Sequence, residues 1–199
     1  RYSGGGYLIA QMALEDVLGV PFADLADEML FGPLGMTRSS FRQPCEPRFR
    51  DDAAAGHGDD GAPRPPGSLV AAELGAGGLH STARDYARFL LAARAAWLGQ
   101  PGAVLGRELA RTAMTRVAAS SFGLGFRVLG DGATARLNHG GSNDGYQSET
   151  NVFLESGDGG VVLMPTDTVY GIAAHPTRPD ALARLFALKG RDASKPVPL

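Results

Sequence analysis

Two kinds of hydrophobic pattern divide this chain at about residue 120. Before that point, apolar side chains recur with the spacing of an amphipathic helix. After it, short apolar runs alternate with glycine-rich turns, which is the pattern of an antiparallel sheet. Helices first and strands afterwards predict an α/β (α+β) fold in which helices pack on an antiparallel sheet.

The helical half contains recognisable start and stop signals. Gly19 follows a periodic run as a C-cap would, and Thr82 with Asp85 forms a capping box. A stretch rich in Pro, Gly, Asp and Arg, residues 42–76, is predicted to be a long loop. Helices are predicted over residues 7–17 and 21–31, which are expected to pack back to back, and over 82–97, 107–117 and 179–188.

The second half is expected to hold four strands, over residues 122–129, 133–139, 146–154 and 160–164. Between the second and third lies a polar, glycine-rich segment with the sequence His139-Gly140-Gly141-Ser142. Glycines at the start of a strand allow close backbone approach, and the histidine and serine supply polar groups for a bound carbonyl or carboxylate. This segment is the first candidate for a site.

Composition excludes some function classes. The 199 residues carry a net charge of -2 with no basic stripe, so nucleic acid is not indicated as a partner. No apolar run is long enough for a membrane span and no signal peptide is visible, which leaves the compartment open. The single cysteine, Cys45, cannot form an internal disulfide and is interpreted as an inert loop thiol.

No cofactor or metal is expected. The loop residues Asp51, Asp52, His57, Asp59 and Asp60 lack the ligand spacing of a metal site and are interpreted as solvated. His80, ahead of the third helix, is interpreted as a cap on local backbone.

Five sequence blocks stand in a characteristic order: YSGGGY at 2–7, PLGMTRSSF at 33–41, GAGGLHSTARDYARFL at 75–90, FGLGF at 122–126 and HGGSNDGYQS at 139–148. In this order they resemble the C-terminal half of the serine beta-lactamase and penicillin-binding-protein-like family, especially its esterase-like and class C relatives. The resemblance covers about residues 1–164. It implies a partial beta-lactamase-like fold whose first half is absent from the chain.

In that family an S-x-x-K motif supplies the nucleophile and its base, a Y-x-N or S-x-N motif adds a second polar group, and K-T-G or H-x-G lines the site. By position, the resemblance makes Tyr2 the catalytic tyrosine and places Gly4 where the family has asparagine. His139, Gly140 and Gly141 take the K-T-G position, and Ser3 and Ser142 complete the implied substrate-binding set. The implied partner is a small acyl substrate, and the lost asparagine favours esters over beta-lactams.

The nucleophile motif is missing from the chain. Its only lysines, Lys189 and Lys195, do not stand three residues after a serine. The chain alone is therefore expected to be inactive in ester, peptide or lactam hydrolysis. The first half of the fold is expected either to lie upstream of Arg1 or to be missing altogether, and activity is expected to need it.

A second resemblance begins near residue 164. The blocks MPTDTVYGI at 164–172, LARLFALKGR at 182–191 and KP at 195–196 resemble the N-terminal signature of YrdC-like threonylcarbamoyl-AMP synthases. Those enzymes use threonine, bicarbonate and ATP. The resemblance implies threonine and nucleotide binding by Thr166, Thr168, Lys189 and Arg191.

Two segments are accordingly predicted: residues 1–164 from a beta-lactamase-like hydrolase and 165–199 as a YrdC-like segment or foreign tail. Three functions remain open. The chain is a serine hydrolase fragment, a synthase fragment that continues beyond Leu199, or a catalytically dead hybrid. The hybrid would expose an apolar sheet edge.

Overall fold

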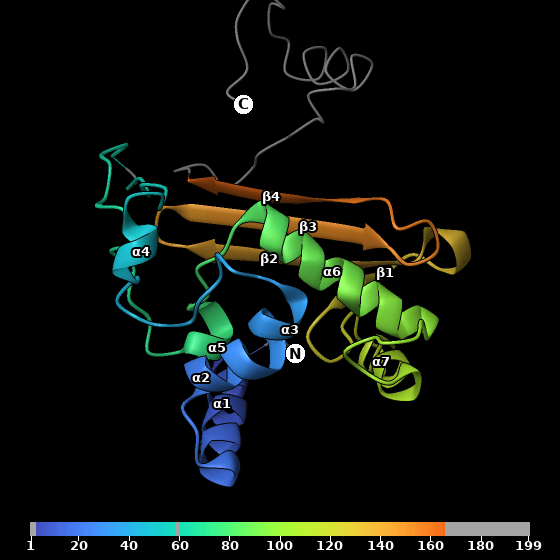
Figure 1. Ribbon diagram of the computed structural model, residues 1–199. Coiled ribbons are helices and arrows are strands. Elements are labelled where there is room, and N and C mark those ends of the chain that lie inside the picture. Colours follow the sequence, from blue (N-terminus) through green and yellow to red (C-terminus); the bar gives the residue numbers. More distant parts are fainter. Residues whose placement is uncertain (1–2, 59, 166–199) are drawn as a thin grey trace, which may run out of the picture. The chain divides into compact units, whose positions relative to one another are not determined.

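The computed structural model describes residues 3–58 and 60–165, which lie within one compact unit of residues 1–167 (Figure 1). Helices come first and strands follow. The helices are α1 (Gly4–Leu18), α2 (Phe22–Ala26), α3 (Gly32–Leu34), α4 (Pro47–Arg50), α5 (Leu74–Gly77), α6 (Ala83–Leu98) and α7 (Arg107–Ala113). The strands are β1 (Arg127–Leu129), β2 (Arg136–Asn143), β3 (Tyr146–Phe153) and β4 (Gly159–Pro165).

The sheet confirms the predicted fold class. Its four strands are antiparallel and lie in the order in which they occur in the chain. The first strand is shorter than predicted because residues 122–126 form a tight turn, in which the Gly123 N–H donates to the Phe126 carbonyl at 2.8 Å. β2 starts late because a 3₁₀ turn, Gly132–Thr134, precedes it.

The core lies between α6 and one face of the sheet (Figure 1). Leu90, Ala93 and Ala96 of α6 pack in one cluster with buried residues of the strands, among them Leu137 and Val152. This burial holds β2, the strand of the candidate site, against the helix. The N-terminus of α6 confirms the predicted cap, because the Thr82 hydroxyl accepts a hydrogen bond from the Asp85 N–H at 3.2 Å.

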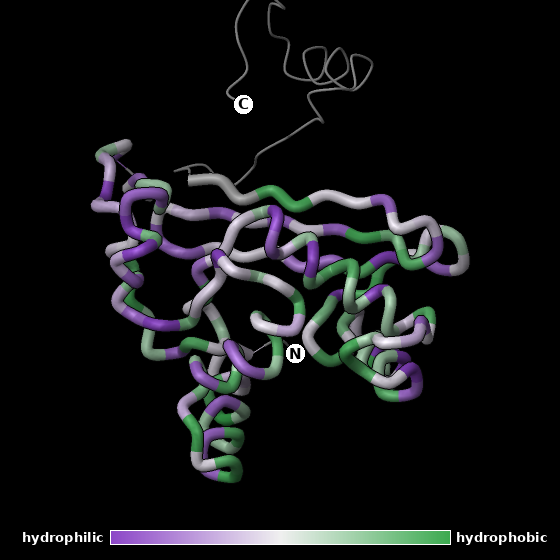
Figure 2. Tube along the Cα trace, viewed as in Figure 1, coloured by the Kyte–Doolittle hydropathy of each residue, from purple (hydrophilic) through white to green (hydrophobic). Residues whose placement is uncertain are grey.

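Helix α1 confirms the predicted helix, and much of its apolar surface is exposed. The Ser3 hydroxyl accepts from the Gly6 N–H at 3.2 Å, so the glycines form the first turn of the helix, and Gly19 ends it at φ 68°. Its one buried residue is Gln11, whereas Val17 is 81% exposed and Ile9 is 70% exposed. Figure 2 shows apolar residues along this helix. Such a surface is typical of an interaction face.

The connections differ from the prediction in detail. The second helix does not break at Gly32 and Pro33, because a π-helical turn, Asp27–Phe31, leads into α3. The chain leaves helical geometry at Gly35, whose φ of 62° suits glycine. The predicted loop contains the short helices α4 and α5. The helix predicted over residues 107–117 is α7, which ends at Ala113. The helix predicted over residues 179–188 lies outside the described residues.

None of the helices in the described part of the chain has the length and apolar character needed to cross a bilayer.

Candidate active site

The segment His139-Gly140-Gly141-Ser142 lies inside β2, not at the start of a strand as predicted. It pairs with residues 147–150 of β3. The register with β1 stops at Asn138, so the opposite edge of β2 extends beyond its short neighbour. A strand edge of this kind presents backbone groups that can pair with another chain or a ligand.

Both glycines of the segment make room for side chains of β3. A Cβ at Gly140 would lie 2.7 Å from Oε2 of Glu149, and a Cβ at Gly141 would lie 2.7 Å from the Ser148 hydroxyl oxygen. The Glu149 carboxylate accepts hydrogen bonds from the side-chain amides of Asn138 and Asn151. Any larger residue at either glycine would displace these groups.

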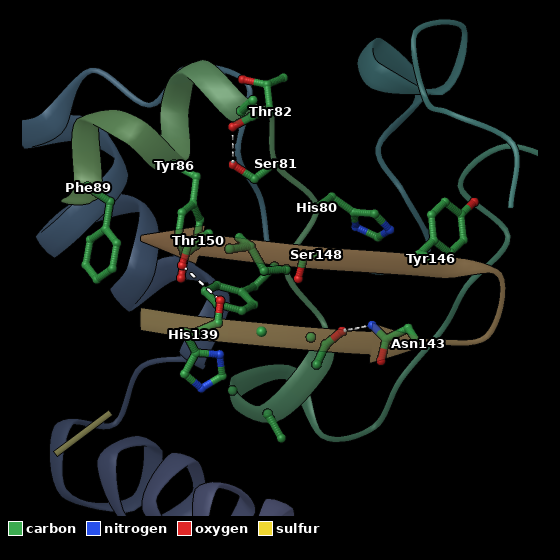
Figure 3. A pocket seen from close by; sticks show the side chains of 18 of the residues that line it. His80, Ser81, Thr82, Tyr86, Phe89, His139, Asn143, Tyr146, Ser148 and Thr150 are labelled. Atoms are coloured by element: carbon green, nitrogen blue, oxygen red, sulfur yellow. Dashed lines mark hydrogen bonds between the residues drawn. The ribbon is translucent and has the colours of Figure 1, made fainter. Parts of the chain in front are cut away.

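A cavity of about 1140 Å³ opens beside this segment (Figure 3). One wall is aromatic. The ring centroids of Tyr86 and Phe89 are 5.6 Å apart, and those of Phe89 and Phe126 are 5.8 Å apart. Burial raises the pKa of the Tyr86 phenol, which stays protonated at neutral pH. The cavity therefore offers an apolar surface next to the polar strand, as small-molecule sites do.

Hydrogen bonds hold the tip of the β2–β3 hairpin in place. The Asn143 side-chain amide donates to the Gly77 carbonyl at 2.9 Å. The Tyr146 hydroxyl donates to the Ala54 carbonyl and accepts from the Gly56 N–H, each at 2.9 Å. The long loop and the segment before α6 are thus tied to the strand that carries the candidate site.

His80 lines the same cavity, and the prediction that it caps backbone is wrong for its side chain. Its backbone N–H and carbonyl pair with Ser40 at 2.9 Å each. Its ring Nδ1 is buried and has no hydrogen-bond partner in the described part of the chain. Burial lowers the pKa of the ring, so His80 is neutral at neutral pH. The sequence held no signal for this, because the residues that pair with His80 and share its cavity lie far from it along the chain.

The lowered pKa predicts an acid-sensitive fold. Below about pH 6.5, the ordinary value, the unfolded chain binds a proton on His80 more readily than the folded chain does. We expect the free energy of unfolding to fall as pH drops from about 6.5 toward the folded-state pKa of His80. Urea unfolding at a series of pH values measures this. The His80→Leu variant should lose that part of the pH dependence, and an unchanged profile would contradict the assignment.

The structure brings together only some of the predicted site residues. His139, Gly140, Gly141 and Ser142 all line the cavity. Ser3 is an exposed N-cap and Gly4 is the first residue of α1, and the residue of α1 that lines the cavity is Tyr7. The predicted residues that lie outside the described part of the chain are Tyr2, Thr166, Thr168, Lys189 and Arg191.

The acidic loop has local partners. Asp52 pairs with Arg38 at 2.7 Å, and Asp60 accepts from the Ala62 N–H at 2.9 Å. Within residues 3–58 and 60–165, no three His, Cys, Asp or Glu side chains gather as a metal site would require.

Comparison with known proteins decides the family. Residues 1–184 match the family model named Beta-lactamase. The chain belongs to the beta-lactamase family. The predicted first resemblance is confirmed, and the family comprises hydrolases with this fold. The chain also matches the threonylcarbamoyl-AMP synthase of Thiobacillus denitrificans, with 43% identity over 54 residues, or 27% of this chain and 28% of that protein.

Solved structures share the beta-lactamase fold with this chain. An octameric penicillin-binding protein homologue from Pyrococcus abyssi has a TM-score of 0.70 at 23% identity, over 99% of this chain and 44% of that one. A beta-lactamase/D-alanine carboxypeptidase from Pseudomonas syringae has a TM-score of 0.69 at 18% identity, over 98% and 60%. The D-amino acid amidase of Ochrobactrum anthropi has a TM-score of 0.63 at 23% identity, over 82% and 49%. This chain thus spans about half the length of these proteins. The junction predicted at residue 164 stays a prediction.

Proposed function

We propose that this chain supplies the substrate-binding part of a serine hydrolase that works through an acyl-enzyme. The observation that carries the proposal is the placement of His139-Gly140-Gly141-Ser142 along a cavity, on a strand edge that extends past β1. Backbone N–H groups and a histidine on such an edge can hold the carbonyl of an acyl substrate. The nucleophile stands on a segment other than these 199 residues, which contain no S-x-x-K motif.

The chemistry assigns each step to a group. The serine oxygen of the S-x-x-K motif attacks the substrate carbonyl carbon, and its proton passes to the lysine. Tyr2 relays a proton to the leaving group as the bond to the carbonyl carbon breaks. Water then attacks the carbonyl carbon of the acyl-enzyme, the bond to the serine oxygen breaks, a proton of the water returns to that oxygen, and the carboxylic acid product leaves. His139 and the following backbone orient the substrate throughout.

Two features support a missing partner segment. The cavity, at about 1140 Å³, exceeds the usual range of roughly 300 to 1,000 Å³ for small-molecule pockets. Several apolar side chains on α1 and on the helical segment that follows it are exposed, among them Ile9, Val17 and Met29. An S-x-x-K segment that fills part of the cavity and covers these side chains accounts for both features. The chain is therefore inactive alone.

Esters are the preferred substrates in this proposal. The position of the family's asparagine is Gly4, which has no side-chain amide to bind an amide group of a beta-lactam. A Cβ at Gly4 would meet nothing within 4 Å, so the described structure leaves room for a side chain there. Steric crowding at residue 4 therefore does not explain why the chain has glycine where the family has asparagine.

The test joins this chain to its S-x-x-K segment. The joined protein should hydrolyse p-nitrophenyl butyrate faster than a chromogenic cephalosporin, in terms of kcat/KM. The 199-residue chain alone should hydrolyse neither. Tyr2→Phe in the joined protein should lower kcat by about 100-fold or more, because a positioned proton relay is lost. A joined protein that hydrolyses no acyl substrate would refute the proposal.

A second candidate function rests on the 43% identity with threonylcarbamoyl-AMP synthase over 54 residues. In it, Thr166, Thr168, Lys189 and Arg191 contribute to threonine and ATP binding, with the rest of that site on residues beyond Leu199. A chain extended by those residues should bind ATP in isothermal titration calorimetry. A catalytically dead hybrid would show neither this binding nor ester hydrolysis.

A further inference from the structure

A second polar corner lies in the cavity, apart from the His139-Gly140-Gly141-Ser142 segment. Tyr146, Ser148 and Thr150 alternate along β3 and so share one face of the sheet. In Figure 3, His80 projects toward the end of β3 that carries Tyr146 and Ser148, whereas His139 projects from β2. His80 and Ser148 both line the cavity.

Two side chains of this corner, His80 and Ser148, have hydrogen-bonding capacity left, whereas the hydroxyls of Tyr146 and Thr150 bond to backbone groups. Nδ1 of His80 is buried without a partner in the described part of the chain, and the same part offers no hydrogen-bond partner to the Ser148 hydroxyl. A buried nitrogen left in this state is costly, so an occupant of the cavity that bonds to it gains affinity. Ser148 stands over Gly141, which puts the corner directly beside the candidate active site.

The charges around the cavity favour an uncharged occupant. Among residues 3–58 and 60–165, the charged side chains that line the cavity are two cations, Arg38 and Arg127, and two carboxylates, Asp52 and Glu149, so their charges balance. Arg38 is paired with Asp52 at 2.7 Å. A neutral imidazole and a hydroxyl can each donate or accept hydrogen bonds. They match a carboxamide or hydroxyl group and supply no charge to balance a carboxylate.

We infer that His80 and Ser148 form a subsite that binds a neutral carboxamide or hydroxyl group of the substrate and discriminates against a carboxylate. The aromatic wall of Tyr86, Phe89 and Phe126 receives the apolar part of the same substrate. The inference rests on the proposed function, because it takes the cavity as the substrate site. It adds His80 and Ser148 as substrate-binding residues and selects uncharged acyl substrates.

The test is a binding experiment on the 199-residue chain, with phenylacetamide and phenylacetate as matched neutral and anionic probes. In the chain labelled with ¹⁵N-histidine, phenylacetamide should shift the ring nitrogen signals of His80 in a saturable way. Phenylacetate should bind at least about tenfold more weakly. His80→Leu should weaken phenylacetamide binding by about three- to tenfold, the effect of one net hydrogen bond.

His57→Leu is the matched control and should bind phenylacetamide as the parent chain does, since His57 does not line the cavity. Should His80→Leu fail to fold, the titration of the unsubstituted chain still decides. Unshifted His80 signals at high phenylacetamide, or tighter binding of phenylacetate, would overturn the inference. Phenylacetamide binding needs no nucleophile, so it can be measured whether or not the joined protein hydrolyses esters. If phenylacetamide binds as expected but the joined protein hydrolyses no ester, the proposed function is rejected and the inference about His80 and Ser148 is not.

Discussion

Asp85→Ala should lower the free energy of unfolding by about 3 kcal/mol, because a buried carboxylate that serves two segments is lost. Asp85 is 2% exposed. Its Oδ2 accepts from the Arg38 backbone N–H at 2.7 Å and from the Ser39 hydroxyl at 3.1 Å. Its Oδ1 pairs with Arg88 at 2.9 Å. Alanine leaves the Arg38 N–H unsatisfied and frees the 38–39 segment from α6, while the Ser39 hydroxyl keeps its hydrogen bond with the Ser81 hydroxyl at 2.8 Å.

Urea unfolding followed by far-ultraviolet circular dichroism measures this effect. Asp52→Ala is the matched control, because Asp52 also meets Arg38, at 2.7 Å, but with a side chain that is 69% exposed. Its loss should cost less than about 1 kcal/mol. Equal effects of the two substitutions would contradict the role assigned to Asp85.

Leu137→Ala should destabilise the chain by about 2–5 kcal/mol. Leu137 has no exposed surface and packs in the core cluster with Leu90 and Val152. It lies on β2 two residues before His139, so the cavity it leaves also loosens the strand of the candidate site. Phenylacetamide binding should weaken in the same variant.

Leu91→Ala on α6 is the control for Leu137, since Leu91 is 53% exposed. Its effect should stay within about 0.5 kcal/mol, as for most surface substitutions. The same urea titration compares the two variants. A Leu137→Ala chain as stable as Leu91→Ala would show that β2 does not depend on this core.

Features that depend on neighbouring residues could be predicted from the sequence. The Thr82 cap of α6 and the left-handed Gly19 after α1 follow from side-chain and backbone chemistry within a few residues. The four strands alternate with turns, and their order along the chain is also their order in the sheet. His139-Gly140-Gly141-Ser142 could be found because two adjacent glycines beside a histidine and a serine are unusual in a strand.

Features that depend on distant contacts could not be predicted. β1 is short partly because the Leu124 N–H donates to the Ala113 carbonyl at 2.7 Å, a contact with the end of α7. The spacing of apolar residues in α1 predicted a helix, but it did not show which segment packs against that helix, and Val17 is exposed. His80 could be placed in the site only from the fold, because the cavity that it lines is also lined by residues of β2, β3 and α6.

The most direct test of the central claim is to map a fluorophosphonate label by mass spectrometry. The protein is produced from the source gene with the DNA that precedes the Arg1 codon. The serine hydrolase account predicts an in-frame S-x-x-K motif in that DNA and one labelled residue, the serine of that motif. A protein that carries no such motif and takes up no label, or a label on a serine within these 199 residues, would contradict it.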